Sequence, residues 1–141
     1  MTTPAYDDEN IFAKILRGEI PAVKLHEDDD TLAFMDVMPQ APGHVLVIPK
    51  YPSRNLLDAY PAAIAKSIPV VQKMARAVKS AFDADGVFVA QFNEAAAGQS
   101  VFHLHFHVIP RHEGTVLKPH SGGMEDMEVL KANAEKIRAA L

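Results

Sequence analysis

The stretch that decides how we expect this chain to fold is Gly98-Gln99-Ser100-Val101-Phe102-His103-Leu104-His105-Phe106-His107-Val108-Ile109-Pro110. Within it, histidines alternate with apolar residues, and successive side chains of a β-strand point to opposite faces. We therefore predict a strand over 101–110. One face carries imidazoles about 6.7 Å apart, those of His103, His105 and His107. The opposite face packs into the core and carries Leu104, Phe106 and Val108.

Three interpretations of this histidine row compete. The first is an exposed sheet face that happens to be rich in histidine. The second is a metal site, because alternate histidines bind one Zn²⁺ when a further ligand converges on it. The third is catalysis, with one histidine as nucleophile or general base near neutral pH. Three histidines in register on an otherwise apolar strand argue against the first interpretation.

The loop before this strand, residues 93–100, favours catalysis. It supplies an amide, small residues, a hydroxyl and a glycine that permits close approach of backbone N–H groups, and such loops suit anionic oxygens. Asn93 and Ser100 also fit a simpler role in stabilising the turn. A phosphate held beside a histidine row would favour nucleophilic attack at phosphorus.

Around this row, the sequence predicts a short helix and four further strands. Asn10 caps a helix from Ile11 to Arg17, which Gly18 ends. Two strands, over 22–27 and 31–36, form a hairpin around the acidic turn at 28–30. The other two strands cover residues 44–49 and 87–92.

Residues 55–84 form the main helical part of the chain. Apolar residues recur there near the helical period, at Ile64, Ile68, Val71, Met74 or Ala75, and Val78. Pro69 should kink or split this helix, since an interior proline costs roughly 3 kcal/mol. A second, amphipathic helix covers 125–141. Together these elements predict an α+β fold with a five-stranded, mainly antiparallel sheet, a long helix and a C-terminal helix.

Length and composition narrow the class of protein. The 141 residues, 48% of them hydrophobic, fit a single domain over 1–141. A net charge of −4 argues against broad binding of nucleic acid, and the absence of cysteine excludes disulfides and thiolate metal sites. Neither a signal peptide nor an apolar run of the roughly 18 residues that span a bilayer is present. We therefore expect a cytoplasmic protein without a membrane partner.

The histidine stretch resembles the signature of the histidine triad (HIT) family, most closely its Hint-type or bacterial Hit-like nucleotide-binding branch. Further motifs that carry the likeness, in family order, are Ile11-Phe12-Ala13-Lys14-Ile15, Leu32-Ala33-Phe34-Met35-Asp36, Pro39-Gln40-Ala41-Pro42-Gly43-His44 and Leu46-Val47-Ile48-Pro49-Lys50. The likeness covers about 10–111. It implies an HIT-like fold with this core and a helical extension over about 112–141.

The resemblance also implies roles for individual residues. His105 is expected to be the nucleophile, His103 and His107 its flanking partners that orient it and contact phosphate oxygens, and His44 a fourth active-site histidine. The expected phosphate and leaving-group loop consists of Asn93, Gly98, Gln99 and Ser100. Asp36 would receive the ribose hydroxyls. The apolar walls around the base would be Ile11, Phe12, Ile15, Phe34, Val37 and Leu46.

The residues alone leave simpler roles open for several of these positions. Asp36 fits a turn-capping aspartate, and His44 fits a partner for a backbone carbonyl. Ile11, Phe12 and Ile15 fit the core face of an ordinary helix.

The expected substrate is a purine nucleotide conjugate of the AMP or GMP type. The resemblance implies hydrolysis of nucleoside phosphoramidates, permits dinucleoside polyphosphates, and leaves room for a nucleotide-binding regulator with little turnover. It also implies a homodimer that buries the helical segment and a strand edge. Many bacterial relatives bind a structural zinc through a Cys-x-x-Cys pair. Asn10 and Ala13 stand at those positions here, so we expect no metal and no cofactor.

Overall fold

Five strands form one sheet in the part of the chain that the computed structural model describes, residues 4–120 and 123–141. Their order across the sheet is β1 (Lys24–Glu27), β2 (Thr31–Met35), β3 (Val45–Pro49), β5 (Phe106–Arg111) and β4 (Gly86–Ala90). All four neighbouring pairs are antiparallel, which confirms the predicted α+β fold and sheet. The acidic turn is also confirmed, because Oδ1 of Asp28 accepts the N–H groups of Asp30 and Thr31.

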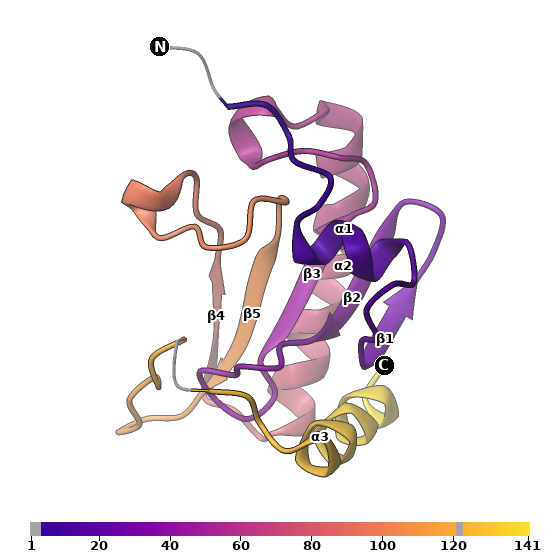
Figure 1. The fold of residues 1–141 in the computed structure, drawn as a ribbon. Helices are drawn as coiled ribbons and strands as arrows, with labels where there is room; N and C mark the ends of the chain where they lie inside the picture. Colours follow the sequence, from indigo (N-terminus) through magenta and orange to yellow (C-terminus); the bar gives the residue numbers. More distant parts are fainter. Residues whose placement is uncertain (1–3, 121–122) are drawn as a thin grey trace.

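Helices cover both faces of the sheet (Figure 1). They are α1 (Ile11–Leu16), α2 (Pro61–Ala81) and α3 (Met127–Ala139), with short 3-10 turns η1 (Leu56–Asp58) and η2 (Ala95–Ala97). Alternate side chains of β2 and β3 point to opposite faces of the sheet. Those that pack with α2 in the larger core are Ala33, Met35, Val45 and Val47. Those that pack with α1 are Leu32, Phe34, Leu46 and Ile48.

Helix α2 runs through Pro69 without interruption, so the expected split of the helix does not occur. Pro69 lies on the exposed side of α2. The carbonyl of Ala65, whose helical partner Pro69 cannot supply, therefore lies where water can bond to it. The buried face holds Val70, Val71, Met74, Ala77 and Val78. Ile68, which the periodicity assigned to that face, is instead 46% exposed.

The last strand is shorter than predicted, because β5 begins at Phe106 instead of residue 101. The carbonyl of Pro49 faces this side of β3 and accepts from Nε2 of His103 at 2.8 Å. Proline has no N–H with which to extend the ladder, so the segment before Phe106 does not pair with β3. The N–H of Leu104 bonds instead to the carbonyl of Ser53, at 2.8 Å. His103 and His105 therefore lie in an irregular segment that leads into the strand.

Helix α1 and its cap agree with the prediction. Oδ1 of Asn10 accepts the N–H of Ala13 at 2.9 Å, and Gly18 takes a left-handed conformation after the helix. Helix α3 contributes Leu130, Ala134 and Ile137 to the larger core. Helix α3 is thus packed against the rest of the chain.

We expect Gly43→Ala to destabilise the protein by about 3 kcal/mol or more. Gly43 has a φ of +87°, and an added Cβ would overlap the ring of Phe82, which belongs to the segment after α2. Gly18→Ala is the matched control, since Gly18 has a similar φ of +78° and open space around it. It should lose only about 1–2 kcal/mol. Equal losses in urea unfolding would contradict the role of Phe82.

Candidate active site

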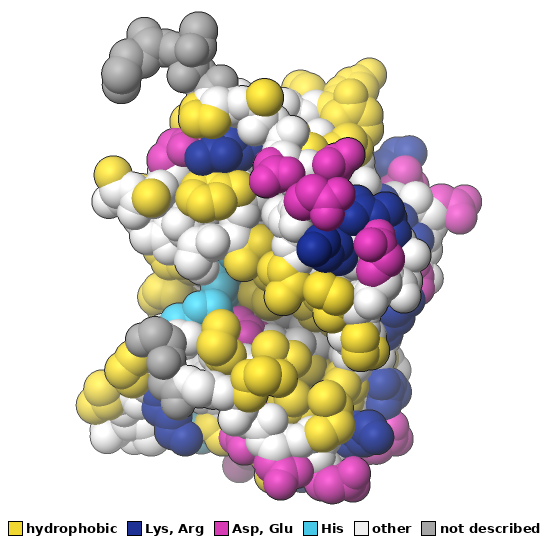
Figure 2. Space-filling view, viewed as in Figure 1, with side chains coloured by type: hydrophobic (Ala, Val, Ile, Leu, Met, Phe, Trp, Pro, Cys, Tyr) yellow, Lys and Arg dark blue, Asp and Glu magenta, His cyan; other side chains and the backbone are white. Residues whose placement is uncertain are grey.

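Two of the three histidines face a narrow cavity of about 90 Å³ between α1 and the sheet. The cavity includes His105, His107, Asp36 and Ser100 in its lining. All six residues predicted as apolar walls also line it, namely Ile11, Phe12, Ile15, Phe34, Val37 and Leu46. In Figure 2 the histidine side chains lie in a recess flanked by apolar side chains.

His105 is buried and held in one orientation. Its Nδ1 lies 2.7 Å from the backbone carbonyl of His103, which can only accept, so Nδ1 carries the proton. In the neutral ring the lone pair is then on Nε2. The ring of Phe12 packs edge-on against His105, with the ring centroids 5.0 Å apart.

His107 is oriented through His44, which comes from the turn before β3. The N–H of Gln40 donates to Nδ1 of His44 at 3.1 Å, so the proton of neutral His44 is on Nε2. That Nε2–H donates to Nδ1 of His107 at 2.9 Å. The remaining proton of His107 is therefore on its Nε2. His105 and His107 thus offer opposite groups, a lone pair and an N–H donor.

Burial lowers the pKa of four of the site's histidines, so each is neutral at pH 7; they are His44, His103, His105 and His107. For His44 and His103 the pKa falls to about 4, although Asp36 partly offsets the effect at His44. For His107 it falls to about 3, because the neighbouring histidines add to the burial. The neutral state agrees with the proton positions assigned from the hydrogen bonds.

Asp36, at the end of β2, is 3% exposed and meets two partners. Its Oδ1 accepts the N–H of Met38 at 2.8 Å, and its Oδ2 accepts Nε2–H of His120 at 2.7 Å. Burial alone would raise the pKa of Asp36, but the His120 hydrogen bond and the nearby His44 hold it below its usual value. The same hydrogen bond raises the pKa of His120.

His120 is a site residue that the sequence did not reveal. It lies beyond β5, in a segment whose backbone bonds to the loop after β2 through Lys118 and Gln40. No periodic pattern or motif marked this position, and only the fold brings it to within 5.6 Å of His107, measured between ring centroids.

His103 is fully buried and does not line the cavity. Its Nε2 donates to the carbonyl of Pro49 at 2.8 Å, and its Nδ1 lies 2.7 Å from the hydroxyl of Tyr6. Both ring nitrogens are thus used within the protein. The structure brings together His44, His105 and His107, and leaves the His103 ring behind them.

Most of the predicted phosphate loop is hydrogen-bonded within the protein. Of its four residues only Ser100 lines the cavity. Gln99 is 4% exposed, and its amide bonds to Arg54, Asn55, Glu94 and Val101. Oδ1 of Asn93 accepts the N–H of Leu56. Gly98, at a φ of +104°, ends the 3-10 turn η2. These residues anchor the loop to the segment before α2.

Asp36, His44 and His107 form the kind of group that could hold a metal ion, with one ligand atom of each within 4.8 Å of the others. Their hydrogen bonds do not fit that use. Because His44 accepts a backbone N–H at Nδ1, its Nε2 carries a proton and has no lone pair for a metal. The hydrogen bond from Nε2–H of His44 also occupies Nδ1 of His107 and leaves the proton of His107 on Nε2.

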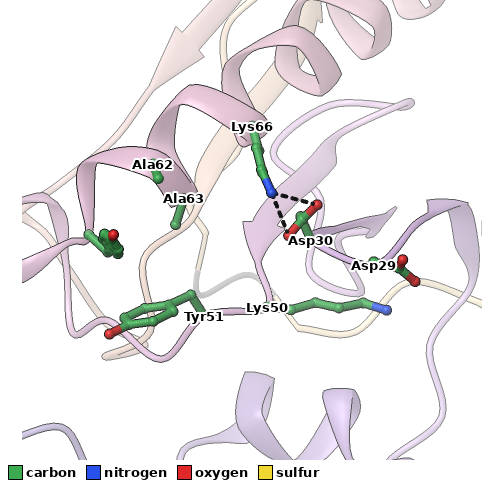
Figure 3. Close-up of a pocket in the computed structure, with 8 residues that line it drawn as sticks. Asp29, Asp30, Lys50, Tyr51, Ala62, Ala63 and Lys66 are labelled. Carbon is green, nitrogen blue, oxygen red and sulfur yellow. Dashed lines mark hydrogen bonds and ion pairs between the residues drawn. The ribbon is translucent and has the colours of Figure 1, made fainter.

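A wider surface pocket of about 300 Å³ lies elsewhere, between the turn at Asp29 and Asp30 and the start of α2 (Figure 3). Both of its lysines are paired, Lys66 with Asp30 at 3.4 Å and Lys50 with Glu27 at 2.9 Å. It contains none of the histidines. We therefore place the candidate site at the smaller cavity, where buried titratable groups converge.

No helix among residues 4–120 and 123–141 combines the length and the apolar character that a membrane crossing requires.

Three known proteins are similar to this chain over most of their length. The adenosine 5'-monophosphoramidase of Saccharomyces cerevisiae is 40% identical over 114 residues, which are 80% of this chain and 70% of the yeast protein. The crystal structure of a Hit-like protein involved in cell-cycle regulation from Bartonella henselae, which holds an unknown ligand, is 60% identical. It covers 97% of this chain and all of its own, with a TM-score of 0.91.

The third is a zinc-bound histidine triad family protein from Mycobacterium smegmatis, 35% identical with a TM-score of 0.82. It covers 94% of this chain and 92% of its own. The model of the HIT domain matches residues 17–114, which include β1 to β5 and every histidine of the site except His120. On this match and these relatives, the chain belongs to the HIT domain family.

Proposed function

We propose that this protein hydrolyses purine nucleoside phosphoramidates or related nucleotidyl conjugates, through a covalent nucleotidyl intermediate on His105. The observation that carries the proposal is the hydrogen bond from Nδ1–H of His105 to the carbonyl of His103, which leaves an Nε2 lone pair for the attack. The similarity to a yeast adenosine 5'-monophosphoramidase supports the substrate class.

The reaction has two steps. Nε2 of His105 attacks the α-phosphorus, a P–N bond to the histidine forms, and the P–N bond to the leaving amine breaks. The amine departs with a proton from water. A water molecule then attacks the same phosphorus, the histidine bond breaks, and the nucleoside monophosphate leaves as the water gives up its proton.

Each neighbouring group has a distinct part in this scheme. The imidazole of His105 becomes cationic as the bond forms, and the carbonyl of His103 stabilises that charge at Nδ1–H. The Nε2–H of His107, fixed through His44, donates to a phosphoryl oxygen. Ser100 and the backbone of its loop hold the other oxygens.

The sugar and base would occupy the cavity beside Asp36. A cavity of about 90 Å³ is smaller than the roughly 300–1,000 Å³ of most ligand pockets, so the site must widen to admit a nucleoside. His120 lines the cavity and donates to Asp36, the carboxylate proposed to accept the ribose hydroxyls. A bound ribose would compete with His120 for Oδ2.

Two other functions remain alternatives within the same site. A dinucleoside polyphosphate hydrolase would use the same nucleophile, and a nucleotide-binding regulator would bind the phosphate with little turnover. Steady-state turnover of an adenosine phosphoramidate, measured beside a diadenosine polyphosphate, separates these three. We prefer nucleoside phosphoramidates as the substrate class because the similar yeast protein is an adenosine 5'-monophosphoramidase.

We further propose a homodimer formed through β4 and α2. Strand β4 lies at the edge of the sheet, and its adjacent residues Phe88 and Val89 are 44% and 49% exposed. Adjacent strand residues point to opposite faces, so apolar surface lies on both sides of this edge. Ile68 of α2 is also exposed, at 46%.

His105→Asn should lower turnover by about 10⁴-fold or more, since it removes the attacking atom. His103→Asn and His107→Asn should cost less, because each removes orientation or charge stabilisation. Rapid quench of the wild type with labelled substrate should trap an acid-labile adduct on His105. Near-normal turnover of His105→Asn, or a label on another histidine, would contradict the mechanism.

Asp36→Ala should weaken binding of ribonucleotides by one to two decades and leave 2′-deoxyribonucleotides comparatively unaffected, because a charged hydrogen bond is worth about 1.5–3 kcal/mol. His120→Ala is the companion variant. It frees Oδ2 of Asp36 and should tighten ribonucleotide binding. Calorimetric titration with both sugars measures the two effects. Equal losses for both sugars in Asp36→Ala would mean that Asp36 only shapes the turn.

Val89→Lys should convert the proposed dimer to a monomer at micromolar concentration, because it places a charge in the middle of the apolar edge. Val116→Lys is the control, since Val116 is 88% exposed and lies outside the sheet. Light scattering of the wild type and both variants tests this. A monomeric wild type would contradict the proposed homodimer.

A further inference from the structure

Tyr6 lies in the segment before α1 and reaches across to His103, 97 residues away in the sequence. Its hydroxyl oxygen is 2.7 Å from Nδ1 of His103, and the two rings meet edge-on with centroids 5.6 Å apart. No motif in the sequence pointed to this tyrosine.

The direction of this hydrogen bond follows from the other nitrogen of His103. The carbonyl of Pro49 can only accept, so Nε2 of His103 carries the ring proton. Nδ1 then has a lone pair, and the Tyr6 hydroxyl donates to it. Burial raises the pKa of Tyr6, which keeps the phenol protonated and able to donate at neutral pH.

We propose that Tyr6 is a positioning residue for the nucleophile and acts through His103. Tyr6 and Pro49 hold the His103 ring from its two nitrogens. That ring belongs to the residue whose carbonyl orients His105. The segment 101–105 has no strand ladder of its own, so side-chain bonds replace the ladder in fixing this carbonyl.

A second contact of the same N-terminal region supports this assignment. Phe12 of α1 packs edge-on against His105, and Asn10 caps α1. The region before and within α1 therefore braces the nucleophile twice, once at its ring through Phe12 and once at its carbonyl partner through Tyr6. Only the expected change in kcat depends on the proposed function; the positioning of His105 by Tyr6 does not.

Tyr6→Phe tests the proposal, because it keeps the ring and removes the hydroxyl. We expect kcat for an adenosine phosphoramidate to fall about tenfold with KM little changed, the size of effect that a buried acceptor without its donor produces. Tyr60→Phe is the matched control. Tyr60 is 49% exposed, contacts Tyr51, and should leave kcat unaltered.

A double-mutant cycle asks whether the effect passes through His103. In the His103→Asn background, Tyr6→Phe should cause no further loss of kcat, because the acceptor is already gone. Additive losses would contradict the proposal. So would a Tyr6→Phe variant that loses thermal stability while its kcat is normal, since that is the behaviour of a residue that only anchors the chain.

Nitrogen NMR of histidine-labelled, ligand-free protein supplies a readout that does not need turnover. In the wild type, Nδ1 of His103 should report a hydrogen-bonded lone pair, and the Nδ1–H of His105 should exchange slowly with water. Tyr6→Phe should shift the first signal and speed the second exchange. If the wild type proves inactive while these signals behave as expected, the proposed function fails and the positioning role stands; unchanged signals overturn the positioning role itself.

Discussion

The hydrogen bond between Nδ1–H of His105 and the carbonyl of His103 is the interaction on which the rest of the site depends. It selects one of two neutral tautomers and so decides which nitrogen faces the cavity. A carbonyl inside a regular ladder would be committed to a neighbouring strand. Here the ladder between β3 and β5 stops at Val47 and Phe106, and the carbonyl of His103, outside the ladder, accepts from the side chain of His105.

Burial gives the site its electrostatic character. His44, His103 and His107 have a pKa of about 4, 4 and 3, below the 6.5 of an exposed imidazole. The folded state therefore holds fewer protons than the unfolded chain between about pH 4 and 6.5. The contribution of these three neutral imidazoles to the free energy of unfolding is fully present above pH 6.5. It is lost as the pH falls below that value, by up to about 1.4 kcal/mol per pH unit for each group. Burial that keeps these histidines neutral therefore makes the fold less stable in acid.

Much of the fold was predictable because its signals are local. The apolar runs of β2 and β3, the Asn10 cap and the acidic turn all depend on neighbours within a few residues. The course of α2 through Pro69 was not, because tertiary packing of Val70, Val71 and Met74 overrides a local penalty. The six apolar wall residues could be predicted from the family pattern, whereas the internal bonds of Gln99 depend on Arg54 and Asn55, 45 and 44 residues away. His120 and Tyr6 carried no pattern at all.

Those two long contacts bear on how the molecule folds. Tyr6 meets His103 across 97 residues, and Asp36 meets His120 across 84. Closing such loops costs chain entropy that only a largely formed sheet can repay, and local hairpins close far sooner. The sheet and α2 can therefore form a collapsed framework before the segments on either side of it settle against the histidines. Native-state opening should run in the opposite order, with the segments that carry Tyr6 and His120 detaching at the lowest free energy while the central strands stay protected from hydrogen exchange.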